Sequence, residues 1–218
     1  GAPIGVASYL SVISKGAAAF ILMILLFTVL KPLMHIWENI VYVIALATMF
    51  IGNLFALRQQ NMKRFLAFSS IAQAGFILLG LITGTQLGTA TIVYFILVYV
   101  FTNLAAFGVV QAIALQTGKE NRDDYNGLYR TNPNLSLVMM LALFSLAGIP
   151  PVAGFFGKFF LFAAAASKGY YLLVFLAVVN VTISLYYYLL VVRAMFIRKS
   201  ETPIPFFKSK IYMRLGLI

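Results

Sequence analysis

Two lysines stand in segments that are otherwise apolar, and they are the residues best placed to do chemistry in this chain. Lys15 lies roughly in the middle of a long apolar run, with Ser14 and Gly16 beside it. An ammonium group at that depth of a membrane costs several kcal/mol. The small neighbours predict close helix packing, so the amine is expected to face protein or internal water. A buried amine reaches its neutral form easily, as a reversible proton carrier must; the alternative is a structural lysine bonded to carbonyl groups.

The second lysine, Lys158, follows a segment that a regular helix cannot tolerate. Gly148, Pro150, Pro151 and Gly154 precede it within a few residues, and the prolines remove two backbone donors. About 13 residues of helix before the break would be ~20 Å long, less than the ~30 Å core of a bilayer. The break is therefore expected inside the membrane, beside a wet cavity that the lysine meets. The alternative is a simple proline kink with a bystander lysine.

Uncharged polar residues within the apolar runs are candidates for a polar path between the lysines. Ser14, Gln73 and Asn103 are the three that we select. Their default role is a hydrogen bond between helices, at about 0.6 kcal/mol each, and holding water in a proton path is the functional one. No carboxylate lies deep in an apolar run. A relay through lysine–carboxylate pairs would need its acidic partner elsewhere.

The composition places these residues in a membrane protein. Of the 218 residues, 62% are hydrophobic and 10% are charged, and the mean hydropathy is +0.98. A soluble domain carries about 25% charged residues, which is more than twice the charged fraction of this chain. So few charges cannot cover a surface that faces water. The apolar runs are continuous and lack the alternation of barrel strands, so they predict helices.

We therefore expect an all-α integral membrane protein, a bundle of about six transmembrane helices with one helix broken at mid-membrane. The helical part is expected over residues 1–197, and a cytoplasmic basic connector over 198–218 that leads to a further span. The expected spans lie near residues 4–30, 39–57, 65–83, 89–116, 135–166 (broken at 148–154) and 170–192. The polar connector over residues 117–133 is expected to be a solvated loop.

The net charge of +11 follows from basic residues in the connectors, and this placement excludes a nucleic-acid-binding face. One side of the membrane is expected to hold Lys31 and Lys168 only. The other side is expected to hold Arg58, Lys63, Arg64, Lys119, Arg122, Arg130, Arg198, Lys199, Lys208, Lys210 and Arg214. By the positive-inside rule, the richer side is the cytoplasm or the mitochondrial matrix.

Other features exclude redox chemistry in the chain itself. There is no cysteine, so disulfides, thiolate-held clusters and cysteine-based zinc sites are ruled out. A dinucleotide-binding fingerprint is also absent from the sequence. The chain starts with glycine and shows no signal-peptide pattern, so we read it as a piece of a longer protein.

Two segments resemble a known family. The run NMKRFLAFSSIAQAGF at residues 61–76 resembles a signature of the antiporter-like subunits of respiratory complex I, and FSLAGIPPVAGFFGKF at 144–159 resembles the broken-helix signature of subunit N, called subunit 2 in mitochondria. The opening GAP with Lys15 and the run LYYY at 185–188 are similar to the second antiporter-like half of that subunit. Gln73 and Phe76 depart from the family, in which histidine and tyrosine are common at these positions.

The resemblance implies a membrane-arm subunit of NADH:quinone oxidoreductase that conducts protons through Lys15 and Lys158. Its partners would be other membrane subunits of complex I and the lipid bilayer. NADH, flavin, iron–sulfur clusters and quinone would be bound by partner subunits, with no cofactor or metal here. A bacterial inner membrane is expected rather than a mitochondrial one. The alternatives are a subunit of a cation/proton antiporter or of a hydrogenase-linked ion pump with the same fold, and a passive scaffold.

Overall fold

The structure, a computed structural model, describes residues 2–200 and 202–207. Within these residues the chain is helical, with one isolated bridge between Asn61 and Asn121 in place of a strand. The elements are α1 (Ile4–Tyr9), η1 (Leu10–Ser14), α2 (Lys15–Ile24), η2 (Leu25–Val29), η3 (Lys31–Leu33), α3 (Met34–Arg58), α4 (Met62–Ile82), α5 (Gln86–Thr117), η4 (Arg122–Tyr125), α6 (Leu128–Thr131), α7 (Pro133–Ala147), α8 (Ala153–Ser167) and α9 (Tyr171–Phe196).

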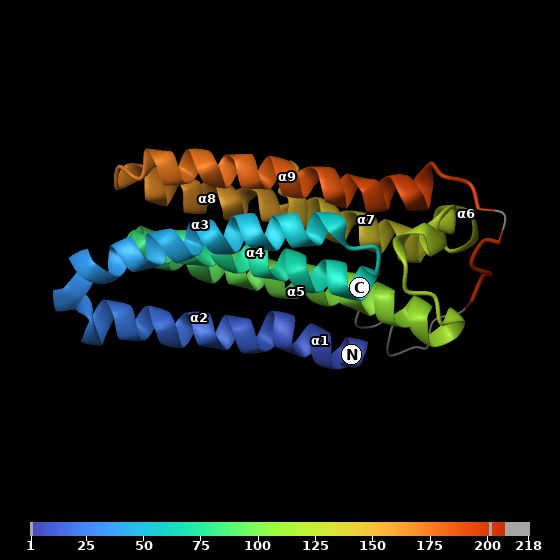
Figure 1. The fold of residues 1–218 in the computed structure, drawn as a ribbon, viewed down its shortest axis with the longest axis horizontal. Helices are drawn as coiled ribbons and strands as arrows, with labels where there is room; N and C mark the ends of the chain where they lie inside the picture. The colour runs from blue at the N-terminus through green and yellow to red at the C-terminus, as the bar shows by residue number, and fades with distance from the viewer. Residues whose placement is uncertain (1, 201, 208–218) are drawn as a thin grey trace.

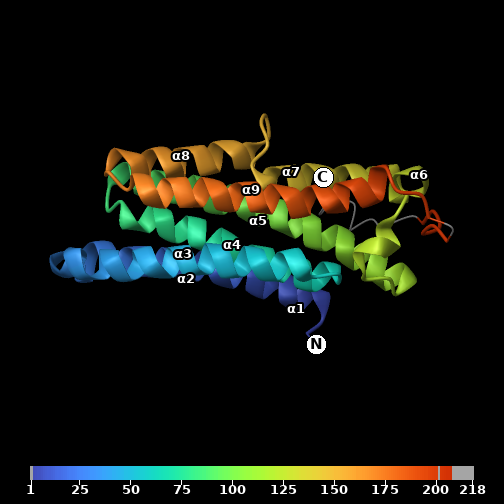
Figure 2. The ribbon, with the colours of Figure 1, turned by 45° about the horizontal axis from the view of Figure 1, so that its top comes forward.

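The long helices run side by side as one bundle (Figures 1 and 2). Among the described residues, five helical segments are long and apolar enough to cross a membrane: Ile4–Val29, Lys31–Arg58, Met62–Ile82, Gln86–Thr117 and Tyr171–Phe196. Helices α7 and α8 are too short to cross alone, at ~22 Å each. They follow one another along the length of the bundle, so together they make one further crossing, which is the fifth in chain order (Figure 2). The predicted all-α membrane bundle is thereby confirmed.

The first crossing is not a regular α-helix, although the sequence suggested one. The π-helical segments η1 and η2 interrupt it at Leu10–Ser14 and Leu25–Val29. A π-helical turn widens the helix and often marks a functional site. Lys15 is the first residue after η1, so the irregular turn sets the direction in which this lysine leaves the helix.

Helix α4 lies at the centre of the bundle, and most of its residues are buried. It passes close to α3, because Gly52 and Gly75 leave no side chain between the two backbones. A Cβ atom on Gly75 would lie 2.9 Å from the carbonyl oxygen of Ala45, and one on Gly52 would lie 3.0 Å from the Cα of Ala72. The central position of α4 brings Ser70 and Gln73 into the interior.

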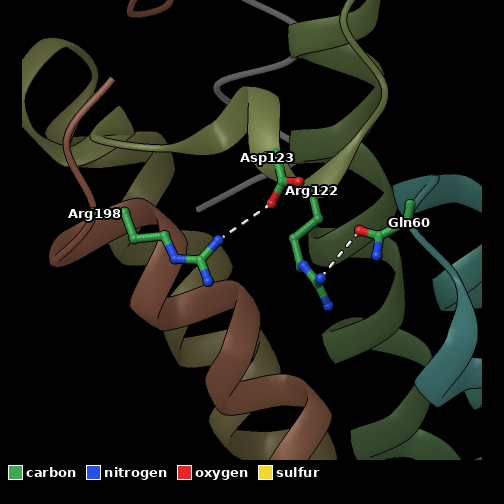
Figure 3. A network of polar contacts seen from close by, with 4 residues as sticks. All are labelled: Gln60, Arg122, Asp123 and Arg198. Atoms are coloured by element: carbon green, nitrogen blue, oxygen red, sulfur yellow. Dashed lines mark hydrogen bonds and ion pairs between the residues drawn. The ribbon is translucent and has the colours of Figure 1, made fainter. Parts of the chain in front are cut away.

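The connector between α5 and α7 is a built structure, so the expectation of a solvated loop is wrong. The side chains of Tyr125 and Leu128 in this connector are completely buried. Arg122 donates to the Oε1 atom of Gln60 at 3.0 Å, and Arg198 pairs with Asp123 at 3.3 Å (Figure 3). These contacts join the connector to the start of α4 and the end of α9. Tyr125 and Leu128 stand among the charged residues of the connector, and these two side chains allow part of it to be buried.

Several helix ends differ from those expected. Helix α3 begins at Met34 instead of near residue 39, α4 at Met62 instead of 65, and α9 continues to Phe196 beyond 192. Apolar content locates spans, whereas caps and packing set their ends. The basic residues Lys208, Lys210 and Arg214 of the expected 198–218 connector lie outside the described residues.

Candidate functional site

Lys15 reaches from the first crossing to α4. Its Nζ atom donates to the carbonyl oxygen of Ser70 and to the Ser70 hydroxyl oxygen, the latter at 3.0 Å. The lysine side chain is partly buried. Neither acceptor is charged, so dipoles hold the ammonium, and no residue that the structure describes forms an ion pair with it.

The helix break between α7 and α8 begins with a regular termination motif. Gly148 has a φ of +85°, and its N–H donates to the carbonyl of Ser145 at 3.1 Å. The N–H of Ile149 donates to the carbonyl of Phe144 at 3.0 Å. This pair of bonds is the Schellman pattern, which needs a left-handed residue and therefore favours glycine. A Cβ on Gly148 would also lie 3.1 Å from the Cδ atom of Lys158, so glycine makes room for that side chain.

Lys158 is buried at this break, with 3% of its surface exposed. Its Nζ donates to the carbonyl oxygens of Leu146 at 2.6 Å and Ala147 at 3.3 Å, and it stands 4.9 Å from the ring centre of Phe76. The last carbonyls of a helix carry partial negative charge, and an aromatic face adds a weak attraction for a cation. The broken end of α7 therefore binds the amine directly.

The two prolines of the break point away from the amine. Pro150 and Pro151, joined by a cis peptide bond, are exposed on the surface of the bundle. Gly154 lies on the inner side, where a Cβ would collide with the backbone of Ser145. The four break residues thus divide between an outer turn and a close crossing of α7 with α8.

A small cavity adjoins Lys158. Its volume of about 10 Å³ is about the space that one water molecule needs. Gln73, one of the predicted polar residues, shares in its lining, and the Nε2 atom of Gln73 donates to the same Leu146 carbonyl at 3.3 Å. The other polar side chains on the cavity wall are those of Tyr99, Thr102, Ser145 and Lys158.

Tyr99 connects this cavity with the Lys15 side, although the sequence analysis did not select this residue. Its hydroxyl donates to the carbonyl of Ser11 at 2.7 Å, one turn before Lys15 on the first crossing. The hydroxyl of Tyr188 accepts from Gln73 at 3.4 Å. Ser70 and Tyr188 belong to the segments that carry the family resemblance, so the sequence offered a signal for them. Tyr99 lies in an apolar helix, and the sequence does not indicate which neighbouring helix its side chain faces.

The remaining predicted residues make no hydrogen bonds to this group within the described part of the chain. Ser14 is exposed on the first crossing. Asn103 is buried one helical turn beyond Tyr99 on α5, and its carboxamide atoms have no hydrogen-bond partner among the described residues. In residues 2–200 and 202–207, no group of three or more histidine and acidic side chains could hold a metal ion.

Curated relatives and a family profile match the chain. The family described as "NADH:quinone oxidoreductase/Mrp antiporter, TM" matches residues 1–184. NADH-quinone oxidoreductase subunit N of Phocaeicola vulgatus is 59% identical over all of this chain and 46% of its own length. NAD(P)H-quinone oxidoreductase subunit 2 of Nostoc punctiforme is 47% identical over 91% of this chain and 37% of its own length. The chain thus spans less than half the length of these relatives.

Solved structures resemble the same bundle. A chain of respiratory complex I from Thermus thermophilus with bound aureothin is 36% identical with a TM-score of 0.71, covering 82% of this chain and 40% of that one. A chain of the Mrp complex from Dietzia sp. DQ12-45-1b is 26% identical with a TM-score of 0.81, covering 87% and 35%. The predicted resemblance to subunit N is confirmed, and the chain belongs to the NADH:quinone oxidoreductase/Mrp antiporter transmembrane family.

Proposed function

We propose that this chain is part of a membrane-arm subunit of NADH:quinone oxidoreductase and conducts protons through Lys15 and Lys158. The observation that carries the proposal is a row of polar groups through an apolar bundle, with an amine at each end. Lys15 bonds to Ser70, Tyr99 bonds to Ser11 one turn before Lys15, and Tyr99 lines the cavity beside Lys158. Proton transfer needs donors and acceptors within hydrogen-bond reach, directly or through one water.

The cost of the lysines supports a functional role. An ionisable side chain in a membrane helix is rare and expensive, and it faces the bundle interior or water when it is kept. Only 3% of the Lys158 surface is exposed, and its hydrogen-bond acceptors are uncharged carbonyls. A cation without a paired anion can lose its proton without leaving a buried anion behind. That property suits a carrier that is charged and discharged in turn.

The cation/proton antiporter remains the second candidate, because the Mrp complex chain has the same bundle. The relative named subunit N is 59% identical, against 26% for the Mrp chain, so we favour the oxidoreductase. In this assignment redox chemistry takes place in other subunits, which would bind NADH, flavin, iron–sulfur clusters and quinone. The location would be a bacterial inner membrane.

The exposed prolines suggest that other protein covers the break. Pro150 and Pro151 are exposed at the surface of the bundle. The break that contains them, between α7 and α8, lies partway along the bundle (Figure 2). Non-helical backbone at membrane depth is tolerated only when protein or a water-filled cavity surrounds it. We therefore expect further membrane segments of the longer protein or of partner subunits to pack on this face.

Substitution of Lys158 tests the proton role. In the full-length protein within its assembled complex, Lys158→Met removes both the charge and the hydrogen-bond donors. Lys158→Arg keeps charge and donors, but an arginine does not release its proton. Both variants are expected to assemble and to lose most NADH-driven proton uptake into membrane vesicles. Lys168→Met is the matched control, because Lys168 is exposed at the end of the same helix and should be neutral.

The two variants separate a carrier from an anchor. If Lys158→Arg pumps normally while Lys158→Met does not, the lysine serves only to bind the carbonyls of α7. Full pumping by Lys158→Met would remove the proton role altogether and leave a passive scaffold. Sodium dependence of transport would move the assignment to the antiporter.

A further inference from the structure

Asn103 is the buried polar side chain that the relay described above leaves unused. It is 1% exposed, and neither its Oδ1 nor its Nδ2 atom has a hydrogen-bond partner in residues 2–200 and 202–207. An unsatisfied buried group costs about 1–3 kcal/mol, and a carboxamide has one acceptor and one donor group to satisfy. Buried polar groups are nearly always bonded to protein or ordered water. The side chain thus marks a place where a small polar ligand is expected.

The position of Asn103 relates this place to Lys15. Tyr99 precedes Asn103 by one helical turn of α5, so the two side chains leave the helix on the same face. On the other side, the Nε2 atom of Gln111 would lie 3.9 Å from a Cβ atom on Gly5. Helices α1 and α5 therefore run side by side between two contacts, Gly5 with Gln111 and Ser11 with Tyr99.

Asn103 lies between those two contacts on α5, and Ser8 lies between them on α1. Ser8 is itself buried, at 9% exposure. The Gln111 end of this row is the end at which the basic connectors gather, because Lys63 there donates to the carbonyl of Ala2 at 3.1 Å. From that end, the order of polar side chains is Gln111, Asn103 with Ser8, and then Tyr99, whose hydroxyl bonds to Ser11 one turn before Lys15.

We propose that the Asn103 carboxamide binds an internal water molecule between α1 and α5, and that protons reach Tyr99 and Lys15 from the basic end of the bundle through this water. A carboxamide offers both a donor and an acceptor, so it can hold a water in either orientation. A water that relays protons must reorient after each transfer, and the carboxamide can bind it in both orientations. The inference rests on the proposed function, because it supplies a proton to the same lysines.

Two substitutions of equal shape test the water site. Threonine and valine are nearly isosteric and both are β-branched, but only threonine has a hydroxyl that can bind water. In the full-length protein within its complex, we expect Asn103→Thr to keep most NADH-driven proton uptake and Asn103→Val to lose it several-fold. Equal pumping by the two variants would overturn the inference and make Asn103 an unsatisfied structural residue.

Two further measurements keep the outcome clear. Lys158→Met is assayed in parallel. If Lys158→Met loses proton uptake while Asn103→Val pumps fully, the water site is rejected and the proposed function stands. Full pumping by Lys158→Met rejects both. If Asn103→Val fails to assemble, a high-resolution map of the unsubstituted complex decides instead. An ordered water within hydrogen-bond distance of the Asn103 amide supports the inference, and a dry, apolar surrounding overturns it.

Discussion

Gly75 sets the distance between α3 and α4, and its replacement by alanine should separate them. A Cβ at this position would lie 2.9 Å from the carbonyl oxygen of Ala45 and 3.0 Å from the backbone N of Met49. Both neighbours are backbone atoms of α3, so they can yield only if the whole helix shifts. Gly16 is a matched control in another helix interior, where the nearest atom is the side-chain Cγ2 of Ile96 at 3.4 Å.

The difference between the two variants isolates the packing cost. Alanine gains about 1 kcal/mol over glycine in a helix interior, and this gain is common to Gly75→Ala and Gly16→Ala. Overpacking costs about 1–3 kcal/mol, and only Gly75→Ala incurs it. We therefore expect Gly75→Ala to be less stable than Gly16→Ala by about 1–3 kcal/mol. For a chain of this size that corresponds to about 2–12 °C in the unfolding midpoint.

Thermal unfolding of both variants in the same detergent measures this difference. The separation of α3 from α4 should also displace Gln73, which stands two residues before Gly75 on α4 and bonds to Leu146 and Tyr188. A loss of proton uptake with Gly75→Ala, but not with Gly16→Ala, would accompany the loss of stability. Equal midpoints for the two variants would refute the close approach of α3 and α4 that the structure shows.

Two further substitutions address buried polar groups away from the lysines. Tyr125→Phe removes a completely buried hydroxyl that has no partner in the described part of the chain, so the unfolding free energy should rise by about 1 kcal/mol. Burial, with Asp124 and Glu120 adding to it, raises the pKa of Tyr125 well above its ordinary value of 10. The unfolded tyrosine therefore ionises first, and the native protein should lose stability above pH ~10 relative to the phenylalanine variant; a constant difference across pH would contradict this. Asn53→Leu leaves the side chains of Tyr187 and Asn180 without their bonds to Asn53, which should cost about 1–3 kcal/mol in unfolding experiments, whereas Asn39→Leu on the exposed face of α3 should cost little. Equal effects of the two asparagine substitutions would argue against the buried network.

The sequence was informative about what lies in the membrane and less so about which groups meet. Continuous apolar runs predict spanning helices because one rule applies to every residue of a span: in lipid its backbone polar groups must be hydrogen-bonded within the protein. The lysines stand out for the same reason, since a charge in such a run is costly wherever it points. Neither rule depends on the neighbouring helices, so both can be read from one segment at a time.

Contacts between helices do depend on rotation and register, which a nearly all-apolar helix does not reveal. Ser70 lies on α4 and Tyr99 on α5, and nothing in either segment shows that both bond to the first crossing. The π-helical turn before Lys15 changes the register of the first crossing, and this made Ser14 an exposed residue instead of a neighbour of the path. Likewise, the two prolines predicted a break in the helix, but they did not indicate that both would be exposed at the surface.

Both lysine amines have contacts that suit either charge state. A lysine ammonium has three N–H donors, and the neutral amine has two together with a lone pair. Lys158 makes two hydrogen bonds, to Leu146 and Ala147, and Lys15 makes two, both to Ser70. Each amine can therefore keep its bonds when it loses a proton, and only the third position changes from donor to acceptor. At Lys158 the adjoining cavity has room for one water, which is the partner that such an exchange requires. The broken end of α7 thus fixes the amine in place without fixing its charge.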